Sequence, residues 1–274
     1  MLTTSLKVSS WMILSVRTYE IYLQLSMLCY ITLGPACALS CPAATIFRNY
    51  FINGTGQGIY TASYALLDII SSRMYVEGEH QVDLLHDVGV LLDNNHNKYW
   101  NMQNGYCLPS TVHSMAAIRD RLDTDATLYD NCYRAMRVGV HWDTEVEMDQ
   151  RQLVTQVFTS ALPVAYSYST KLDDWTRFAC FVLEVAFDAT LAVGRVLSHE
   201  RGDARVKVYL TPVGGGAFGN QPLWIVQAIE KALWKHRQAP LDVVLVHYRC
   251  LDPQFLTIQP IHLLCNSTLI ASRS

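Results

Sequence analysis

The stretch RVKVYLTPVGGGAFGNQPLWIVQAIEKALWKHRQAPLDVVLV, residues 205–246, contains the pattern that decides the fold. Residues 205–210 alternate and are rich in β-formers, which predicts a strand. Apolar residues then recur at helical spacing from Ile225 to Leu233, which predicts an amphipathic helix. Residues 241–246 are nearly all apolar, as is typical of a strand covered on both faces. Strand, helix and strand at this spacing predict a βαβ unit with a parallel sheet.

The neighbouring segments extend this unit toward the N-terminus. Residues 153–161 read as another strand, and Asp173 and Asp174 can cap a long helix that continues to Leu197. The C-terminal half is therefore predicted as β-α-β-α-β, and the whole chain as an α/β fold of three layers, α/β/α. Before it we expect a helix around residues 80–92, a loop at 93–108, and short helices near 111–122 and 129–137.

Composition limits the classes of partner. Half of the 274 residues are hydrophobic, 16% are charged, and the net charge is −3 without a Lys/Arg-rich run, so we expect no nucleic-acid binding. Eight cysteines are scattered without a CxxC pair, which favours reduced, buried thiols over a metal site or a disulfide framework. This cysteine usage is that of a cytoplasmic protein.

The N-terminal residues 1–34 leave an alternative open. Residues 11–33 are strongly apolar and long enough to span a membrane, but Arg17 and Glu20 interrupt them. The start also lacks the basic region and short apolar core of a secretory signal. We expect a buried helix or strand here, with a membrane anchor as the alternative.

The glycine loop between the strand and the helix suggests a ligand. The loop follows the carboxyl end of a strand and precedes the N-terminus of a helix, where backbone N–H groups and the helix dipole favour an anion. The candidate ligand-binding residues in it are Gly214, Gly215, Gly216, Phe218, Gly219 and Asn220. The loop lacks the GK[ST] of a P-loop and does not match a Rossmann fingerprint. Tight packing of the turn is the alternative explanation for the glycines.

A strand followed by GGGAFGN and an amphipathic helix resembles the second diphosphate-binding loop of macro domains, which bind ADP-ribose. The resemblance covers residues 40–250 and implies a three-layer α/β/α sandwich with a mixed, mostly parallel sheet. It also implies a facing loop, for which Asn49, Gly54, Gly56 and Gln57 are the candidates. In the poly(ADP-ribose) glycohydrolase branch, a Gly-rich loop leads directly to Gln-Glu-Glu at a helix start. Here Gln81-Val82-Asp83 would take that place, with Val82 departing from the pattern and residues 59–77 as an insertion.

Two carboxylates are the candidates for catalysis. Asp83 and Asp87 are four residues apart, so on a helix they share a face, and their like charges can raise one pKa. Cleavage of a glycosidic bond needs a carboxylate beside an oxocarbenium-like transition state and an acid for the leaving group. The alternative is that both carboxylates form an ordinary solvated helix face.

Two further groups of polar residues are candidates for a site. In an extended segment, one side would carry His141, Asp143, Glu145 and Glu147. These residues could form a metal site or a second catalytic site; the alternative is a solvated edge of a strand. Asn104-Gly105 signals a turn, and Asn104 is a candidate for an adenine pocket.

These observations lead to one organisation and one leading function. We expect an apolar N-terminal segment at 1–34, a macro-like domain at 35–250 and a C-terminal extension at 251–274. The leading hypothesis is a hydrolase that removes ADP-ribose from protein side chains, with ADP-ribose or an ADP-ribosylated protein as partner and with no cofactor or metal. The alternatives are a non-catalytic ADP-ribose or nucleotide-binding module, and a membrane-associated protein.

Overall fold

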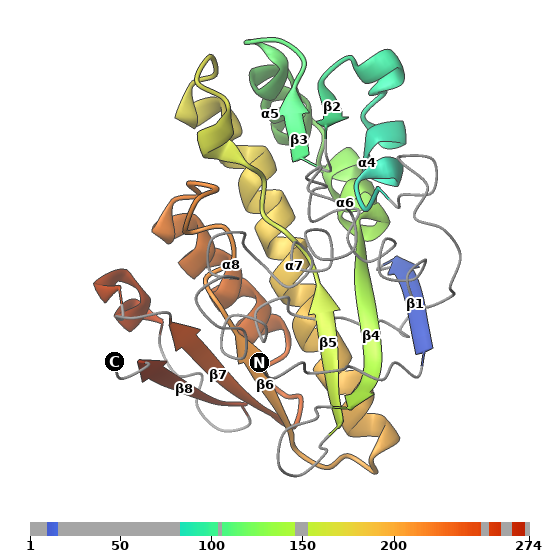
Figure 1. Ribbon diagram of the computed structural model, residues 1–274, viewed down its shortest axis with the longest axis vertical. Coiled ribbons are helices and arrows are strands. Elements are labelled where there is room, and N and C mark those ends of the chain that lie inside the picture. The colour runs from blue at the N-terminus through green and yellow to red at the C-terminus, as the bar shows by residue number, and fades with distance from the viewer. Residues whose placement is uncertain are drawn as a thin grey trace, which may run out of the picture.

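A computed structural model describes the chain in six ranges (Figure 1). They are residues 10–15, 83–103, 106–145, 153–247, 252–258 and 265–271.

One sheet is antiparallel and brings the N-terminal segment into the fold. Strand β1 (Ser10–Ser15) pairs antiparallel with β4 (Arg137–Glu145), which pairs antiparallel with β5 (Leu153–Phe158). Part of the apolar N-terminal stretch is therefore a strand. Within the described ranges, no helix is long and apolar enough to cross a membrane.

A second sheet is parallel and contains the predicted βαβ unit. Strand β6 (Val206–Leu210) pairs in parallel with β7 (Leu241–His247), and β7 pairs in parallel with β8 (Cys265–Ala271). Helix α8 (Pro222–Lys235) connects β6 to β7. The short helix η3 (Pro253–Thr257) lies between β7 and β8 in the chain.

The segment before β4 forms a small helical region with a hairpin. Helix α4 (His86–Leu91) and the turn η1 (Asn95–Asn97) lead into the antiparallel hairpin of β2 (Trp100–Gln103) and β3 (Tyr106–Pro109). Helices α5 (Ser114–Thr124) and α6 (Ala126–Ala135) follow. The side chain of Asn94 holds the base of the hairpin, because it accepts from the N–H of Tyr99 and donates to the carbonyl of Trp100.

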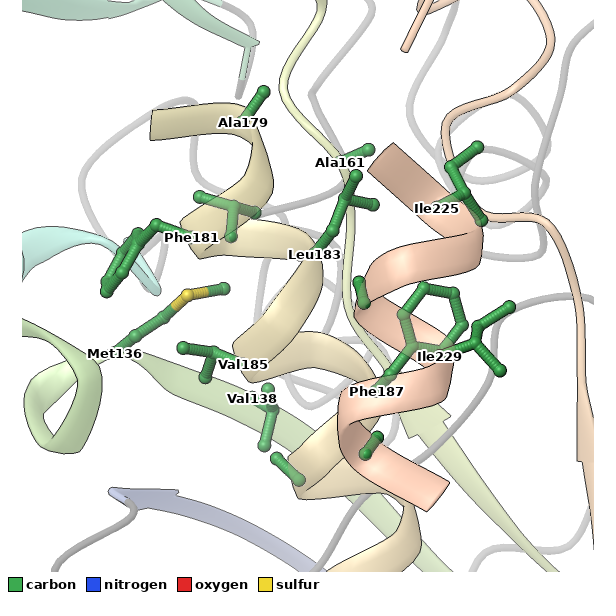
Figure 2. Close-up of a cluster of buried hydrophobic side chains, with 14 of the residues drawn as sticks. Met136, Val138, Ala161, Ala179, Phe181, Leu183, Val185, Phe187, Ile225 and Ile229 are labelled. Carbon is green, nitrogen blue, oxygen red and sulfur yellow. The ribbon is translucent and has the colours of Figure 1, made fainter. Parts of the chain in front are cut away.

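Helix α7 (Leu172–Glu200) runs through the middle of the core. After β5 the chain forms the turn η2 (Val164–Tyr166) and then enters this helix. Figure 2 shows side chains of α7 between Met136 and Val138 on one side and Ile225 and Ile229 of α8 on the other. All belong to one cluster of buried apolar residues.

Gly194 explains how closely α7 approaches the parallel sheet. A Cβ at this position would lie 2.7 Å from Cγ2 of Val208 in β6 and 3.0 Å from Cδ2 of Leu241 in β7. The missing side chain therefore lets the helix backbone rest directly on two strands.

The α/β class predicted from the sequence is confirmed, as a mixture of helices with parallel and antiparallel sheets. Three local predictions need correction. The helix expected around residues 80–92 is described only over His86–Leu91, because a turn precedes it. The loop expected at 93–108 contains the β2–β3 hairpin, and the Asn104-Gly105 signal lies outside the described residues. Asp173 and Asp174 lie in the first turn of α7 rather than capping it, and the N-cap is Lys171.

Candidate functional site

The glycine loop joins the end of β6 at Leu210 to the start of α8 at Pro222. It thus lies at the carboxyl end of a parallel strand and at the N-terminus of a 14-residue helix, as predicted. This is where open α/β sheets bind ligands, and where helix dipoles favour negative charge.

The glycines of this loop are not equivalent. Gly214 has a φ of +85° and Gly219 a φ of +68°, a region that side chains rarely adopt. A Cβ at Gly214 would lie 2.3 Å from Cβ of Ala161, and one at Gly219 would lie 2.7 Å from Cβ of Ala165. Tight packing, the alternative weighed from the sequence, therefore accounts for these two glycines.

Gly216 differs from both. Its φ lies outside the left-handed region, and an added Cβ would meet no atom of the described residues within 4 Å. Packing among these residues gives no reason for glycine at this position. The open space is the approach that a ligand to the backbone would need.

The hydrogen bonds of the loop leave a row of N–H groups free. Within the loop, the N–H of Gly215 donates to Pro212, that of Gly219 to Gly216 and that of Asn220 to Gly214. Among the described residues, the consecutive N–H groups of Gly216, Ala217 and Phe218 donate to no acceptor. Successive free N–H groups in a turn form a concavity that binds anions.

Asn220 closes the loop. Its side chain is buried, and Nδ2 donates to the carbonyl of Leu162 at 2.8 Å and to that of Gly214 at 3.3 Å. Its Oδ1 is buried and has no partner among the described residues, as is true of Oγ1 of Thr159 and Oγ1 of Thr211. Thr159 follows the carboxyl end of β5, Thr211 follows that of β6, and Asn220 ends the glycine loop. Burying such groups is costly, which is typical of functional sites or sites of ordered water.

The segment after β5 forms a wall of the site that sequence reasoning missed. The N–H of Ala165 donates to the carbonyl of Phe218 at 2.9 Å, so the turn η2 is bonded directly to the glycine loop. The contacts of Ala161 and Ala165 with the glycines hold the same two segments together. The small side chains at 161 and 165 were a signal for this close approach, but alanine is too common for that signal to be specific.

Three aromatic rings meet beside the free N–H groups. Phe218 lies edge-on to Tyr166 at 5.5 Å and to Tyr106 at 6.0 Å, and the rings of Tyr106 and Tyr166 are 5.3 Å apart. The rings come from three segments: β3, η2 and the glycine loop. Phe218 is partly buried and packs against the core, so much of its ring serves the protein itself.

Asp83 lies in the turn before α4. Its Oδ1 accepts from the N–H of Leu85 at 2.8 Å, and its carbonyl accepts from the N–H of His86. Burial raises the pKa of Asp83, and the negative charge of Asp87 raises it further. The hydrogen bond from the N–H of Leu85 and the charge of His86 lower it, but the net shift is upward. A carboxyl group with a raised pKa is suited to donate a proton.

Asp87 has a different environment. Its Oδ2 accepts from Nε of Arg137 at 2.9 Å and also from Nη2 of the same residue. Arg137 is the first residue of β4, and its N–H donates to the carbonyl of Leu84. Asp87 thus anchors the start of α4 to β4, a role that neither of the two sequence interpretations had included.

The two carboxylates are not joined to the glycine loop by any contact between described residues. The charge of Asp83 contributes to raising the pKa of Cys107, after burial, so the carboxylate lies near that thiol. Cys107 and Tyr106 are adjacent in β3 and point to opposite faces. Asp83 is therefore linked to the Cys107 face of the hairpin, and the aromatic group to the other face.

Several predicted site residues lie outside the described residues. They are Asn49, Gly54, Gly56, Gln57, Gln81 and Asn104. His141, Asp143 and Glu145 lie in β4, but the pairing of β4 with β5 shifts register between His141 and Thr144, which interrupts the expected alternation. The side chains of these three residues, and Glu147 altogether, lie outside the described part of the chain.

Comparisons with known proteins add no relative: no family model, no curated protein and no solved structure matches the chain.

Proposed function

We propose that the chain is an ADP-ribose-binding hydrolase that removes ADP-ribose from modified protein side chains. In this proposal the domain is a macro-like, three-layer α/β/α sandwich with a mixed, mostly parallel sheet. The observation that carries the proposal is the row of free N–H groups at Gly216, Ala217 and Phe218, ahead of the N-terminus of α8 and beside three aromatic rings.

The chemistry of that row suits a diphosphate. Hydrogen bonds to a charged acceptor contribute about 1.5–3 kcal/mol each, and the helix dipole adds favourable potential. Three such bonds give at most roughly 4.5–9 kcal/mol, and micromolar affinity corresponds to about 8 kcal/mol. The row can thus supply a large part of the affinity for a phosphate-containing ligand, and the rings offer an apolar surface for the rest.

Asp83 is the proposed general acid. Its raised pKa, caused chiefly by burial, favours the protonated form, which can pass its proton to the leaving side chain as the bond to the ribose breaks. Water adds to the same ribose carbon, and its proton restores the acid form of Asp83. We assign Asp87 no proton transfer, because its carboxylate is engaged by Arg137.

A second candidate is a module that binds ADP-ribose without turnover. It is favoured by the lack of a described contact between Asp83 and the glycine loop. The same ligand site then serves recognition alone, and the carboxylates at 83 and 87 serve the fold.

Calorimetry on the full chain with ADP-ribose tests the binding. We expect micromolar affinity for the wild type, and for Gly216→Ala a loss of at least about tenfold, because the added methyl would obstruct the ligand without touching the protein. Absence of wild-type binding at millimolar ADP-ribose would remove both candidates.

Release of ADP-ribose from a mono-ADP-ribosylated protein separates the two candidates. The hydrolase predicts release by the wild type, and its loss in Asp83→Asn with binding retained. Asp87→Asn is the matched control, four residues further along the chain. Release that is intact in Asp83→Asn would make the catalytic assignment wrong, and binding without release in the wild type would favour the module.

A further inference from the structure

A second group of charged side chains surrounds Tyr99, the residue that precedes β2 at the base of the hairpin. Nζ of Lys98 lies 4.8 Å from the centre of the Tyr99 ring, and the guanidinium carbon of Arg121, from α5, lies 6.0 Å from it. Both side chains also interact with the Tyr99 hydroxyl. Two cations are therefore held at one phenol, where their like charges repel each other.

One carboxylate offsets part of this charge. Oδ2 of Asp93 lies 2.9 Å from Nη2 of Arg121, but the Asp93 side chain is 63% exposed, so water screens the pair. Within the ranges that the structure describes, Lys98 forms no ion pair with a carboxylate. The group of two cations and one carboxylate therefore keeps one positive charge without a partner.

The backbone that carries Lys98 has an unusual conformation. Three of the five residues before it have a positive φ, namely Asp93 (48°), His96 (55°) and Asn97 (57°). Such a conformation costs on the order of 1–2 kcal/mol in a residue other than glycine and persists only where the surroundings impose it. Oδ1 of Asn94 accepts from the N–H of Tyr99 at 2.7 Å and thereby fixes the end of the segment. Lys98 is thus held in place before any ligand arrives.

The surroundings of the Tyr99 hydroxyl favour negative charge. Burial acts to raise the pKa of Tyr99, which is 7% exposed, but the interactions with Lys98 and Arg121 and their positive charges outweigh burial and lower it. The same positive field stabilises an anion that reaches the hydroxyl, and a neutral phenol donates a hydrogen bond to such an anion. Two cations and a donor at one point are the chemistry that recognises a phosphate group.

This group of side chains lies away from the glycine loop. Tyr106, the hairpin residue beside the loop, pairs with Gln103. Trp100, which follows Tyr99, pairs with Pro109 at the other end of the hairpin. Trp100 and Gln103 are three positions apart on an extended strand, which corresponds to roughly 10 Å. A ligand at Tyr99 therefore occupies a place of its own.

We propose that Lys98, Tyr99 and Arg121 form a second anion site, which binds a phosphate group between the two cations and the phenol hydroxyl. Asp93 competes with the phosphate for Arg121. The site goes beyond the proposed function, because it shares no residue with the glycine loop and requires neither ADP-ribose nor hydrolysis.

The test is NMR of the full chain labelled with ¹³Cζ-tyrosine and titrated with inorganic phosphate at constant ionic strength. The Tyr99 signal, one of fifteen, is assigned with Tyr99→Phe. Lys98→Gln removes the cation that has no partner. Asp93→Asn removes the competing carboxylate, and asparagine adopts a positive φ readily. Lys171→Gln is the matched control, because it removes another exposed lysine, just before α7.

The proposal predicts a saturable shift of the Tyr99 signal with a Kd on the order of 1 mM, as two or three charge-assisted hydrogen bonds allow. Lys98→Gln should weaken the binding by about tenfold, and Asp93→Asn should tighten it by about threefold. Lys171→Gln should bind as the wild type does. Phosphoserine and AMP as further probes show whether the phosphate of a modified protein or that of a nucleotide binds more tightly.

Three results would overturn the proposal. The first is a Tyr99 signal that does not move with phosphate. The second is an equal loss in Lys98→Gln and Lys171→Gln, or no tightening in Asp93→Asn, since a purely structural role for these side chains predicts no such contrast. The third is a Tyr99 response that is lost in Gly216→Ala, because the phosphate would then act from the glycine loop. A response that survives in Gly216→Ala supports the second site whether or not the chain binds ADP-ribose.

Discussion

Gly214 has a φ of +85°, and a methyl group added to it would lie 2.3 Å from Cβ of Ala161. Both effects oppose a side chain, and together they predict that Gly214→Ala lowers the free energy of unfolding by about 2–5 kcal/mol. Gly216→Ala should change it by less than about 0.5 kcal/mol, because no atom of the described residues lies within 4 Å of the added Cβ. Urea denaturation of the two variants measures the difference. Equal losses would mean that both glycines serve packing.

Asp83 gives a pH-dependent prediction. Because burial raises its pKa in the folded state, folding disfavours the ionised form, and stability falls as the pH rises from the unfolded value of about 3.9 through the folded pKa. Asp83→Asn keeps an acceptor for the N–H of Leu85 but cannot ionise. The unfolding free energy of the variant, relative to the wild type, should therefore increase from about pH 3 to about pH 7. A flat or decreasing difference would contradict the raised pKa.

At the residue scale, the sequence identified the loop but not the reason for each residue in it. The GGGAFGN pattern predicted a ligand loop, yet packing requires Gly214 and Gly219 and leaves Gly216 open. That distinction depends on Ala161 and Ala165, which lie more than 50 positions away along the chain. The ion pair of Asp87 with Arg137 spans 50 residues and had no local signal.

The helices α6, α7 and α8 share a polar network that stabilises their contact. Asp188 of α7 is buried and accepts from Tyr133 of α6 and from His236, which follows α8, both at 2.8 Å. Lys235 also pairs with it. One helical turn earlier, Tyr129 and Lys231 contact Glu184 in the same manner.

Asp188 should make the protein acid-sensitive. Burial acts to raise its pKa, but the hydrogen bonds from His236 and Lys235 and their charges outweigh burial and lower it. A lowered pKa contributes stability above the unfolded value of about 3.9, and this contribution is lost as the pH falls through the folded pKa. Asp188→Asn should cost about 3–5 kcal/mol at neutral pH and weaken the dependence of stability on pH below about 4.

Glu184→Gln is the matched control for this network. The Glu184 side chain is 11% exposed and its partner Lys231 is 62% exposed, so water screens the pair more than it screens Asp188. Glu184→Gln should therefore lose clearly less unfolding free energy than Asp188→Asn in urea titrations of the two variants. A Glu184→Gln variant at least as unstable as Asp188→Asn would contradict the role assigned to burial.

At the element scale, helices and strands with a strong hydrophobic period were predicted well from the sequence, and elements with a weak local signal were not. The helical spacing from Ile225 to Leu233 and the strands on either side lie within α8, β6 and β7. The hairpin before α5 was missed because its strands are four residues each, too short to show a period. The Asp173-Asp174 pair resembles a cap, but the helix begins one position before it.

At the scale of the molecule, long-range pairing was the part that the sequence could not supply. The pairing of β1 with β4 joins residues more than 120 positions apart, and β8 joins the parallel sheet from the segment expected to be an extension. Such contacts depend on topology rather than on local pattern. One buried cluster nevertheless includes residues of α7, α8 and strands of both larger sheets, so local patterns did indicate the core.

Binding of the ligand should stabilise the folded chain as a whole. A ligand that binds only the folded chain stabilises it by about 2.7 kcal/mol at one hundred times its Kd. For a chain of this size, ADP-ribose should raise the Tm by roughly 5 °C at that concentration. The shift should be much smaller for Gly216→Ala at the same concentration. A full shift in that variant would show that the ligand binds elsewhere.

Amide NMR tests most directly whether the N–H groups of Gly216, Ala217 and Phe218 bind the phosphates of the ligand. Selective labelling with ¹⁵N-phenylalanine gives at most eight amide signals, of which the Phe218 signal is assigned by substitution. On titration with ADP-ribose, we expect the Phe218 signal to move downfield by far more than the other seven, and to stay in place in Gly216→Ala. An unmoved Phe218 signal in the presence of bound ADP-ribose would contradict the account.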